Sequence, residues 1–174
     1  MALLVATESF STGNVNKTSS LRQTLEACWL DSHICEEGQH QKLKDQFKNI
    51  SKLISKWHFF DSTDKLQDYL QNNSNTKLIT IMSGRFARNI LAMISEKEAL
   101  HSVYVLTIDI DRHKQALGND PKLQAIFNDE NALYDQLQKD LVQLYWNEGK
   151  RLAMSNQDSE ARVYFDESRR LSPH

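Results

Sequence analysis

The chain has 174 residues, of which 40% are hydrophobic, and this size and composition suit one globular domain with a small addition. Its 21 Lys and Arg residues against 23 Asp and Glu residues give a formal charge of -2, which excludes a general electrostatic attraction to nucleic acid or to anionic membranes. The first ten residues lack the basic segment and cleavage site of a signal peptide, and no stretch approaches 18 uninterrupted apolar residues, so we expect a cytoplasmic protein that does not enter membranes.

The amino-terminal residues carry no periodic pattern. Residues 11–20, STGNVNKTSS, are small and polar and cannot bury enough apolar surface to offset the entropy lost on ordering. We therefore predict a mobile arm over residues 1–23. The chain's two cysteines, Cys28 and Cys35, lack the C-x-x-C spacing of metal ligands, so we predict reduced thiols and no metal site.

After the arm, short apolar runs alternate with longer amphipathic segments. The runs have the nearly continuous apolar content of strands that are covered on both faces. They are LEACWLD (25–31), HFFD (58–61), KLITIMS (77–83), SVYVLTID (102–109) and LQAIFND (123–129).

The segments between these runs have helical periodicity. From residue 36 to 57 an apolar residue recurs every three or four positions, which predicts one helix over the whole segment. Ser62 or Thr63 can cap a second helix, a third begins near Gly84, and a short polar helix covers residues 112–117. The alternation predicts an α/β domain over residues 24–140, doubly wound around a mainly parallel five-stranded sheet like that of flavodoxins and receivers.

Ligands of doubly wound sheets bind beyond the carboxyl ends of the strands. The predicted binding residues there are Ser83, Gly84 and Arg85, with Asp31 as an additional candidate, because free N–H groups at a helix start attract anions. The stretch is neither a P-loop nor a dinucleotide fingerprint. The alternative is that Gly84 serves the packing of strand against helix. No cofactor is predicted.

Acidic residues also follow several strands. Asp31, Asp61, Asp109 and Asp111 suit magnesium if they converge; the simpler interpretation is a set of turns and a solvated loop. Phosphoacceptor chemistry of the receiver kind needs a carboxylate after the third strand, where this chain has Ser83. The histidines lie in no nucleophile elbow, so we predict no hydrolase triad.

Residues 141–174 predict a helical hairpin with a polar break near residue 156. A window that starts at Val142 resembles a tetratricopeptide repeat, whose diagnostic places are filled by Tyr145, Gly149, Ala161, Phe165 and Pro173. Glu148, Leu152 and Ser168 depart from that pattern. The alternative is a generic hairpin.

A single repeat cannot bury its own apolar face. Its aromatic residues must therefore pack on the α/β domain or on further repeats. We predict them as protein-interaction residues: Tyr145, Trp146, Tyr164 and Phe165.

The stretches CWLDSHI, FFDSTDKLQDYL, KLITIMSGRFARNIL, HSVYVLTIDIDRH and LQAIFNDENALYDQL, across residues 26–172, resemble an amino-terminal Rossmann-like module of some invertebrate proteins. In those proteins the module precedes tetratricopeptide arrays or domains similar to arginine-specific mono-ADP-ribosyltransferases. The resemblance implies no catalytic residue. Glu96-Lys97-Glu98 matches the Glu-x-Glu element of those transferases in letters, but it lacks the accompanying strands and is expected to be a solvated helix end.

Two functions remain open at this stage. The first is a non-catalytic interaction or scaffolding module that binds a protein or peptide, with further repeats downstream. The second is a nucleotide- or NAD-binding signalling domain that uses the residues after the strands. Nucleic-acid binding is disfavoured, because the arginines of the tail are interleaved with acidic residues.

Overall fold

The computed structural model describes residues 23–38 and 40–172. Five strands form one sheet in the order β2-β1-β3-β4-β5, and every pairing is parallel, which confirms the predicted fold class. The strands are β1 (Thr24–Leu30), β2 (Trp57–Phe60), β3 (Thr76–Ser83), β4 (Leu100–Leu106) and β5 (Leu123–Phe127). The predicted arm lies outside the described residues except for Gln23.

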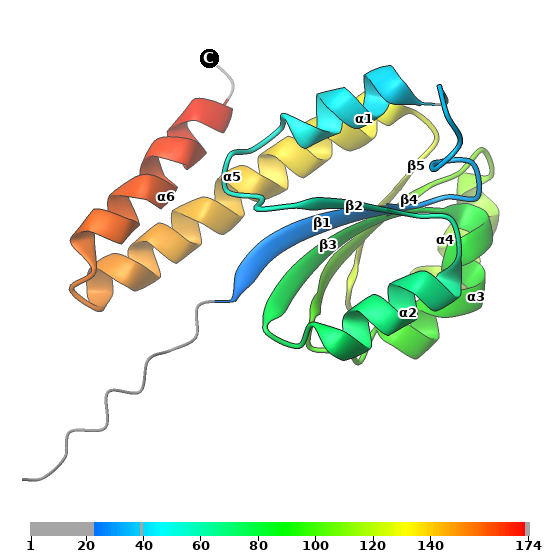
Figure 1. Cartoon of the computed structure of the whole chain (residues 1–174), viewed down its shortest axis with the longest axis horizontal. Helices are drawn as coiled ribbons and strands as arrows, with labels where there is room; N and C mark the ends of the chain where they lie inside the picture. The colour runs from blue at the N-terminus through cyan, green and yellow to red at the C-terminus, as the bar shows by residue number, and fades with distance from the viewer. Residues whose placement is uncertain (1–22, 39, 173–174) are drawn as a thin grey trace, which may run out of the picture.

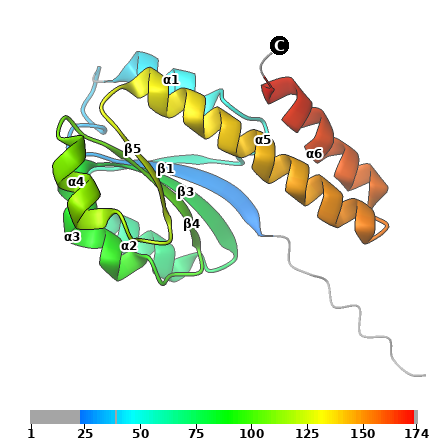
Figure 2. The same ribbon diagram turned by 180° about the vertical axis from the view of Figure 1, so that it is seen from behind.

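Helices cover both faces of the sheet (Figure 1). One face carries α1 (Gln41–Lys48) and α5 (Glu130–Met154), and the other carries α2 (Thr63–Asn72), α3 (Gly84–Ile94) and α4 (Ile110–Leu117). The last helix, α6 (Asp158–Leu171), lies along the carboxyl-terminal half of α5, as the reverse view also shows (Figure 2). The predicted hairpin is therefore present, with its break between Met154 and Asp158.

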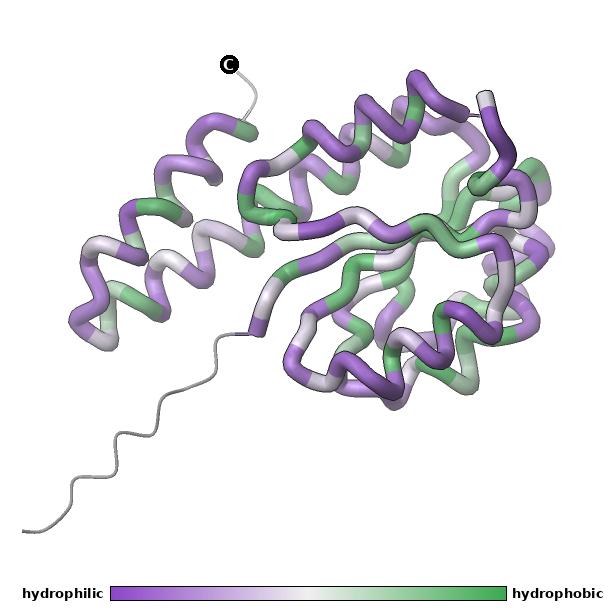
Figure 3. The backbone as a smooth tube through the Cα atoms, viewed as in Figure 1, coloured by the Kyte–Doolittle hydropathy of each residue, from purple (hydrophilic) through white to green (hydrophobic). Residues whose placement is uncertain are grey.

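Successive strand residues point to opposite faces and build two cores. Trp29, Ile81 and Tyr104 face α1 and α5, where Trp29 meets Phe47 edge to face at a centroid distance of 5.1 Å. Neighbouring residues such as Leu30 face α2 and α3. Hydropathy alternates along the helices because only one stripe of each is buried (Figure 3). Near-continuous apolar strands are thus the consequence of a sheet that is covered on both sides.

The first predicted helix is much longer than the observed one. It was expected over residues 36–57, but α1 ends at Lys48. The following residues still bury Ile50 and Ile54, from an irregular connection rather than from a helix. Tertiary hydrogen bonds explain the break, because the Ile50 carbonyl accepts from Arg170 at 2.9 Å and the Lys52 N–H donates to Glu167 at 2.8 Å. These bonds replace the helical partners of that backbone.

The fourth strand also differs in its bounds from the prediction. It was expected over residues 102–109, whereas β4 spans Leu100–Leu106. Asp109 instead caps α4, where its carboxylate accepts from the Arg112 N–H at 3.2 Å. Asp129 caps α5 in the same way by accepting from the Ala132 N–H at 2.8 Å. Asp109 and Asp129, which both follow strands, therefore serve as N-caps of the next helices.

Helix α5 connects the α/β domain to the hairpin without an interruption. Its first half packs Leu133 and Leu137 on the sheet, and its second half extends past the sheet and holds α6 (Figure 1). The predicted boundary between residues 140 and 141 lies inside this helix. The hairpin and the sheet consequently share one rigid element.

Candidate functional site

The predicted anion-binding residues lie at the carboxyl edge of the sheet. Because α1 and α3 cover opposite faces, the crevice of this fold is expected between β1 and β3, which Asp31 and Ser83 follow directly. Arg85 is exposed at this edge. The pKa of His33 is raised mainly by its hydrogen bond to Glu36; the charge of Asp31 adds to the rise, and the charge of Arg85 opposes it. The structure therefore brings these four charged groups into one neighbourhood.

Gly84 is explained by close packing. A Cβ atom at this position would lie 2.5 Å from Nε2 of His113 and 2.7 Å from Oγ1 of Thr107. The His113 ring is buried, and its Nδ1 lies 2.7 Å from the carbonyl oxygen of Asp109. Only glycine lets the start of α3 approach this imidazole, and packing thus gives a sufficient reason for Gly84 without a ligand.

The predicted acidic set does not form a ligand cage. Asp61 pairs with Lys65 at 2.7 Å, Asp109 caps α4, and Asp31 accepts from the His33 N–H at 2.9 Å. Within residues 23–38 and 40–172, no group of three His, Cys, Asp or Glu side chains could hold a metal ion. Asp31, Asp61 and Asp109 have local structural roles instead, and Asp111 lies in the first turn of α4.

The two hairpin helices approach each other closely where Gly149 meets Phe165. A Cβ atom at Gly149 would lie 2.7 Å from the Phe165 ring. Trp146 stacks edge to face on the same Phe165 with a centroid distance of 5.0 Å. Ser168, where alanine is usual in the repeat, donates to the Val142 carbonyl at 2.9 Å. The small and aromatic residues therefore let two helices pack closely.

The four predicted interaction residues separate into two groups. Tyr145 is only 1% exposed, so its side chain is not available to a partner; it belongs to the core between α5 and α1. Tyr164 lies against it with a ring-centroid distance of 6.0 Å. Trp146 is 45% exposed, and Tyr164 and Phe165 are both half-buried, so of the four only Tyr145 is inaccessible.

A buried polar network fastens the hairpin to the α/β domain. The Tyr145 hydroxyl lies 2.7 Å from Oγ of Ser51, which donates to Glu167 at 3.0 Å. Arg170 pairs with Glu167 at 2.8 Å. The pKa of Glu167 is lowered to about 2, chiefly by the hydrogen bond from Arg170, with further bonds from Lys52 and Ser51. The charged carboxylate is thus satisfied on all sides.

An open groove lies beside the accessible aromatic rings. We define the hairpin groove as the hollow of about 540 Å³ along α6 and the end of α5. It is lined by Ala153, Asp158, Ala161, Arg162, Phe165, Asp166 and Arg169. Lys150, whose ammonium lies 5.4 Å from the Trp146 ring centroid, stands near this groove. The groove thus combines small side chains, an aromatic ring and charged groups of both signs.

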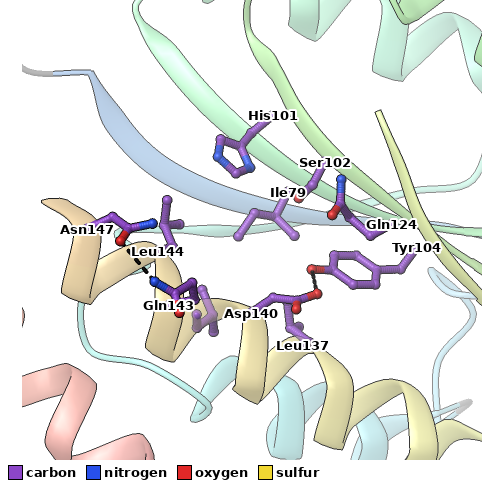
Figure 4. Close-up of a pocket in the computed structure, with 11 residues that line it drawn as sticks. Ile79, His101, Ser102, Tyr104, Gln124, Leu137, Asp140, Gln143, Leu144 and Asn147 are labelled. Carbon is purple, nitrogen blue, oxygen red and sulfur yellow. Dashed lines mark hydrogen bonds between the residues drawn. The ribbon is translucent and has the colours of Figure 1, made fainter. Parts of the chain in front are cut away.

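A second hollow lies between the sheet and α5 (Figure 4). This α5 cavity has a volume of about 230 Å³ and is lined on one side by Ile79, His101, Ser102, Tyr104 and Gln124, and on the other by Leu137, Asp140, Leu141, Gln143, Leu144 and Asn147. The sequence did not indicate this cavity. Its polar residues lie on β4, β5 and α5. A polar residue on an otherwise buried helix face, such as Asp140 between Leu137 and Leu141, is the signal that could have revealed it.

No family model, no curated protein and no solved structure matches the chain. Among the described helices, none combines the length and apolar content needed to cross a bilayer.

Proposed function

We propose that this chain is a protein-interaction module whose hairpin groove docks an amphipathic helix of its partner. The observation that carries the proposal is the exposed Trp146 packed on Phe165 at the edge of a groove between two helices. Solvent-exposed tryptophan costs free energy that burial by a partner would recover, and tryptophan is enriched among the residues that dominate binding.

The shape of the groove favours a helix over an extended peptide. Ala153 and Ala161 line the groove with small side chains, and a third helix can pack its side-chain ridge along this surface. This is the place where the next helix of a tetratricopeptide array would lie, which is consistent with the resemblance of the tail to one repeat. The docking helix can belong to a separate protein or to a longer form of this chain.

Charge around the groove indicates the character of that helix. Arg162 and Lys150 are exposed, and neither has an ion-pair partner within the described residues. An aspartate or glutamate beside the apolar stripe of the docking helix would meet these cations and fix the orientation of binding. Because Asp158 and Asp166 also line the groove, the expected partner is an amphipathic helix with an acidic residue placed opposite Arg162.

A displayed library of helical peptides tests this function. Sequences selected on the intact chain should share apolar residues at i, i+3 or i+4, and i+7, with acidic residues alongside. Trp146→Ala and Arg162→Glu should each weaken the selected peptides at least about tenfold, the scale of one lost anchor. Val163→Glu is the matched control, since Val163 is exposed on α6 but does not line the groove. Peptides without helical spacing, or binding that survives Arg162→Glu, would refute the proposal.

The second candidate function is nucleotide or NAD binding at the carboxyl edge of the sheet. It is supported by the strand order, which places Asp31 and Ser83 at the switch point, and by the exposed Arg85 beside them. Titration with NAD, ATP and ADP-ribose should then raise the melting temperature of the intact chain, and Arg85→Ala should abolish the rise. Arg88→Ala, an exposed change one turn along α3, is the control.

A further inference from the structure

The α5 cavity lies apart from the hairpin groove and from the carboxyl ends of the strands. His101 and Ser102 are the second and third residues of β4, so the cavity opens on the amino-terminal half of the sheet. Its base is apolar, with Ile79 on the sheet and Leu137, Leu141 and Leu144 on the helix. A ligand there would rest between the leucines of α5 and a sheet side on which Ile79 lies among polar and aromatic residues.

Asp140 is the lining side chain that is best suited to accept a hydrogen bond from a ligand. Its Oδ2 accepts from the Tyr104 hydroxyl at 2.6 Å and its Oδ1 accepts from Gln136 at 2.9 Å. No Lys, Arg or His side chain pairs with this carboxylate in the part of the chain that the structure describes. Because each oxygen retains a free lone pair, Asp140 can accept a further hydrogen bond from an N–H group.

His101 faces the cavity from the sheet (Figure 4). Its Nδ1 is buried and has no hydrogen-bond partner in the structure. Burial, together with Lys77 and Lys122, lowers the pKa of this imidazole, so the ring is neutral at pH 7. Because its Nδ1 is buried, the ring contributes a neutral aromatic surface to the cavity and no charge.

Amide side chains complete the polar lining. Gln143 donates to Asn147 at 2.9 Å along α5, and Gln124 stands opposite on β5. Each amide both donates and accepts, which suits a ligand edge of mixed donors and acceptors. The lining contains no Lys or Arg side chain to hold a phosphate. A ligand that fits this lining is small and uncharged, and it carries hydrogen-bonding groups at the edge of a planar ring.

We propose that the α5 cavity binds a nucleobase that carries an exocyclic amino group, with the amino group donating to Asp140. The leucines of α5 and Ile79 take the faces of the ring, and the amide side chains take its polar edge, the division by which proteins read an isolated base. The site is independent of the hairpin groove and of the residues at the strand ends.

The test uses the intact chain and defined probes. Adenine and cytosine are titrated by calorimetry, and amide chemical shifts identify the binding site; leucine, as a zwitterion, and adenosine monophosphate are measured in parallel. Adenine or cytosine should bind at one site and shift the amides of residues 101–104 and 140–147. Asp140→Asn preserves an acceptor for Tyr104 but halves the acceptors for the ligand, and should weaken binding at least about tenfold. Asp135→Asn, exposed on the same helix, should leave it unchanged.

Three results would overturn the proposal. The first is the absence of binding by both bases, which would mean that the cavity holds only water. The second is tighter binding of leucine or of the monophosphate than of either base. The third is base binding that Asp140→Asn leaves intact, because the amino group would then lie elsewhere.

Discussion

At the residue scale, two glycines mark the positions where helices make their closest approaches. Gly84 admits the imidazole of His113 and Gly149 admits the ring of Phe165. Gly84 belongs to the stretch that the sequence predicts as an anion-binding site. Its contacts with His113 and Thr107 give close packing as a sufficient reason for a glycine at this position. From the sequence alone, ligand binding and close packing are both possible reasons for Gly84. The packing reason becomes visible only in the structure, because the contacting residue, His113, lies 29 positions further along the chain.

Gly84→Ala should destabilise the protein by about 1–3 kcal/mol, because the new methyl group overlaps the imidazole of His113. The overlap is removed if the ring is removed. We expect the cost of Gly84→Ala in a His113→Ala background to be smaller by about 1 kcal/mol or more, measured as a double-mutant cycle in urea. Equal costs in both backgrounds would show that the ring does not constrain this position.

Glu167 should make stability depend on pH. Its pKa is about 2 in the folded state against an ordinary 4.5, so the unfolded chain binds the proton more tightly. The resulting stability is fully present above about pH 4.5 and is lost as the pH falls toward about 2. Allowing for the 42% exposure of Arg170, we expect Glu167→Gln to cost on the order of 2 kcal/mol at pH 7.

Urea unfolding at pH 7, 4 and 3 measures this effect. The difference in unfolding free energy between the original chain and Glu167→Gln should become smaller as the pH falls. Asp166→Asn is the control, because Asp166 pairs with Arg169 in an exposed position and should cost little at any pH. A deficit that is constant from pH 7 to pH 3 would mean that the charge of Glu167 is not what stabilises the fold.

At the scale of elements, the sequence predicted every strand and most helices to within a few residues. Periodicity sufficed there because each element buries one regular face. It failed for α1, where Ile50 and Ile54 continue the helical spacing but the backbone bonds to α6 instead. Those partners lie 115 and 120 residues away in the sequence, and no local pattern reports them. The same reason hides the burial of Tyr145 against Ser51.

The pairing of α5 with α6 depends on the lack of a side chain at Gly149. Gly149→Val should destabilise the chain by about 1–3 kcal/mol, because the branched side chain would collide with Phe165. Lys139→Val places the same residue at an exposed site of the same helix and should cost only a few tenths of a kcal/mol. Chemical denaturation of both variants provides the comparison, and similar losses would contradict close helix packing at Gly149.

At the scale of the whole molecule, the hairpin and the α/β domain behave as one body in this structure. Helix α5 runs through both, and the network of Ser51, Tyr145, Glu167 and Arg170 connects them. The predicted division at residue 140 rests on the repeat-like pattern of the two helices. That pattern contains no information on how the helices pack against the α/β domain. The resemblance to an invertebrate amino-terminal module stays a prediction.

We therefore expect one cooperative unfolding transition. Far-ultraviolet circular dichroism, which follows all helices, and the chemical shifts of α6 should change at the same urea concentration. Loss of α6 signals at a lower concentration than the loss of the sheet would show that the hairpin unfolds separately.

The most direct test of the proposed function is hydrogen–deuterium exchange on the intact chain, with and without a helical peptide selected for binding. We predict slower exchange in residues 150–170 on binding and unchanged exchange around residues 31 and 83–85. Protection that appears at the ends of β1 and β3, with none along α6, would contradict the hairpin groove as the docking site and would favour the strand-end site instead.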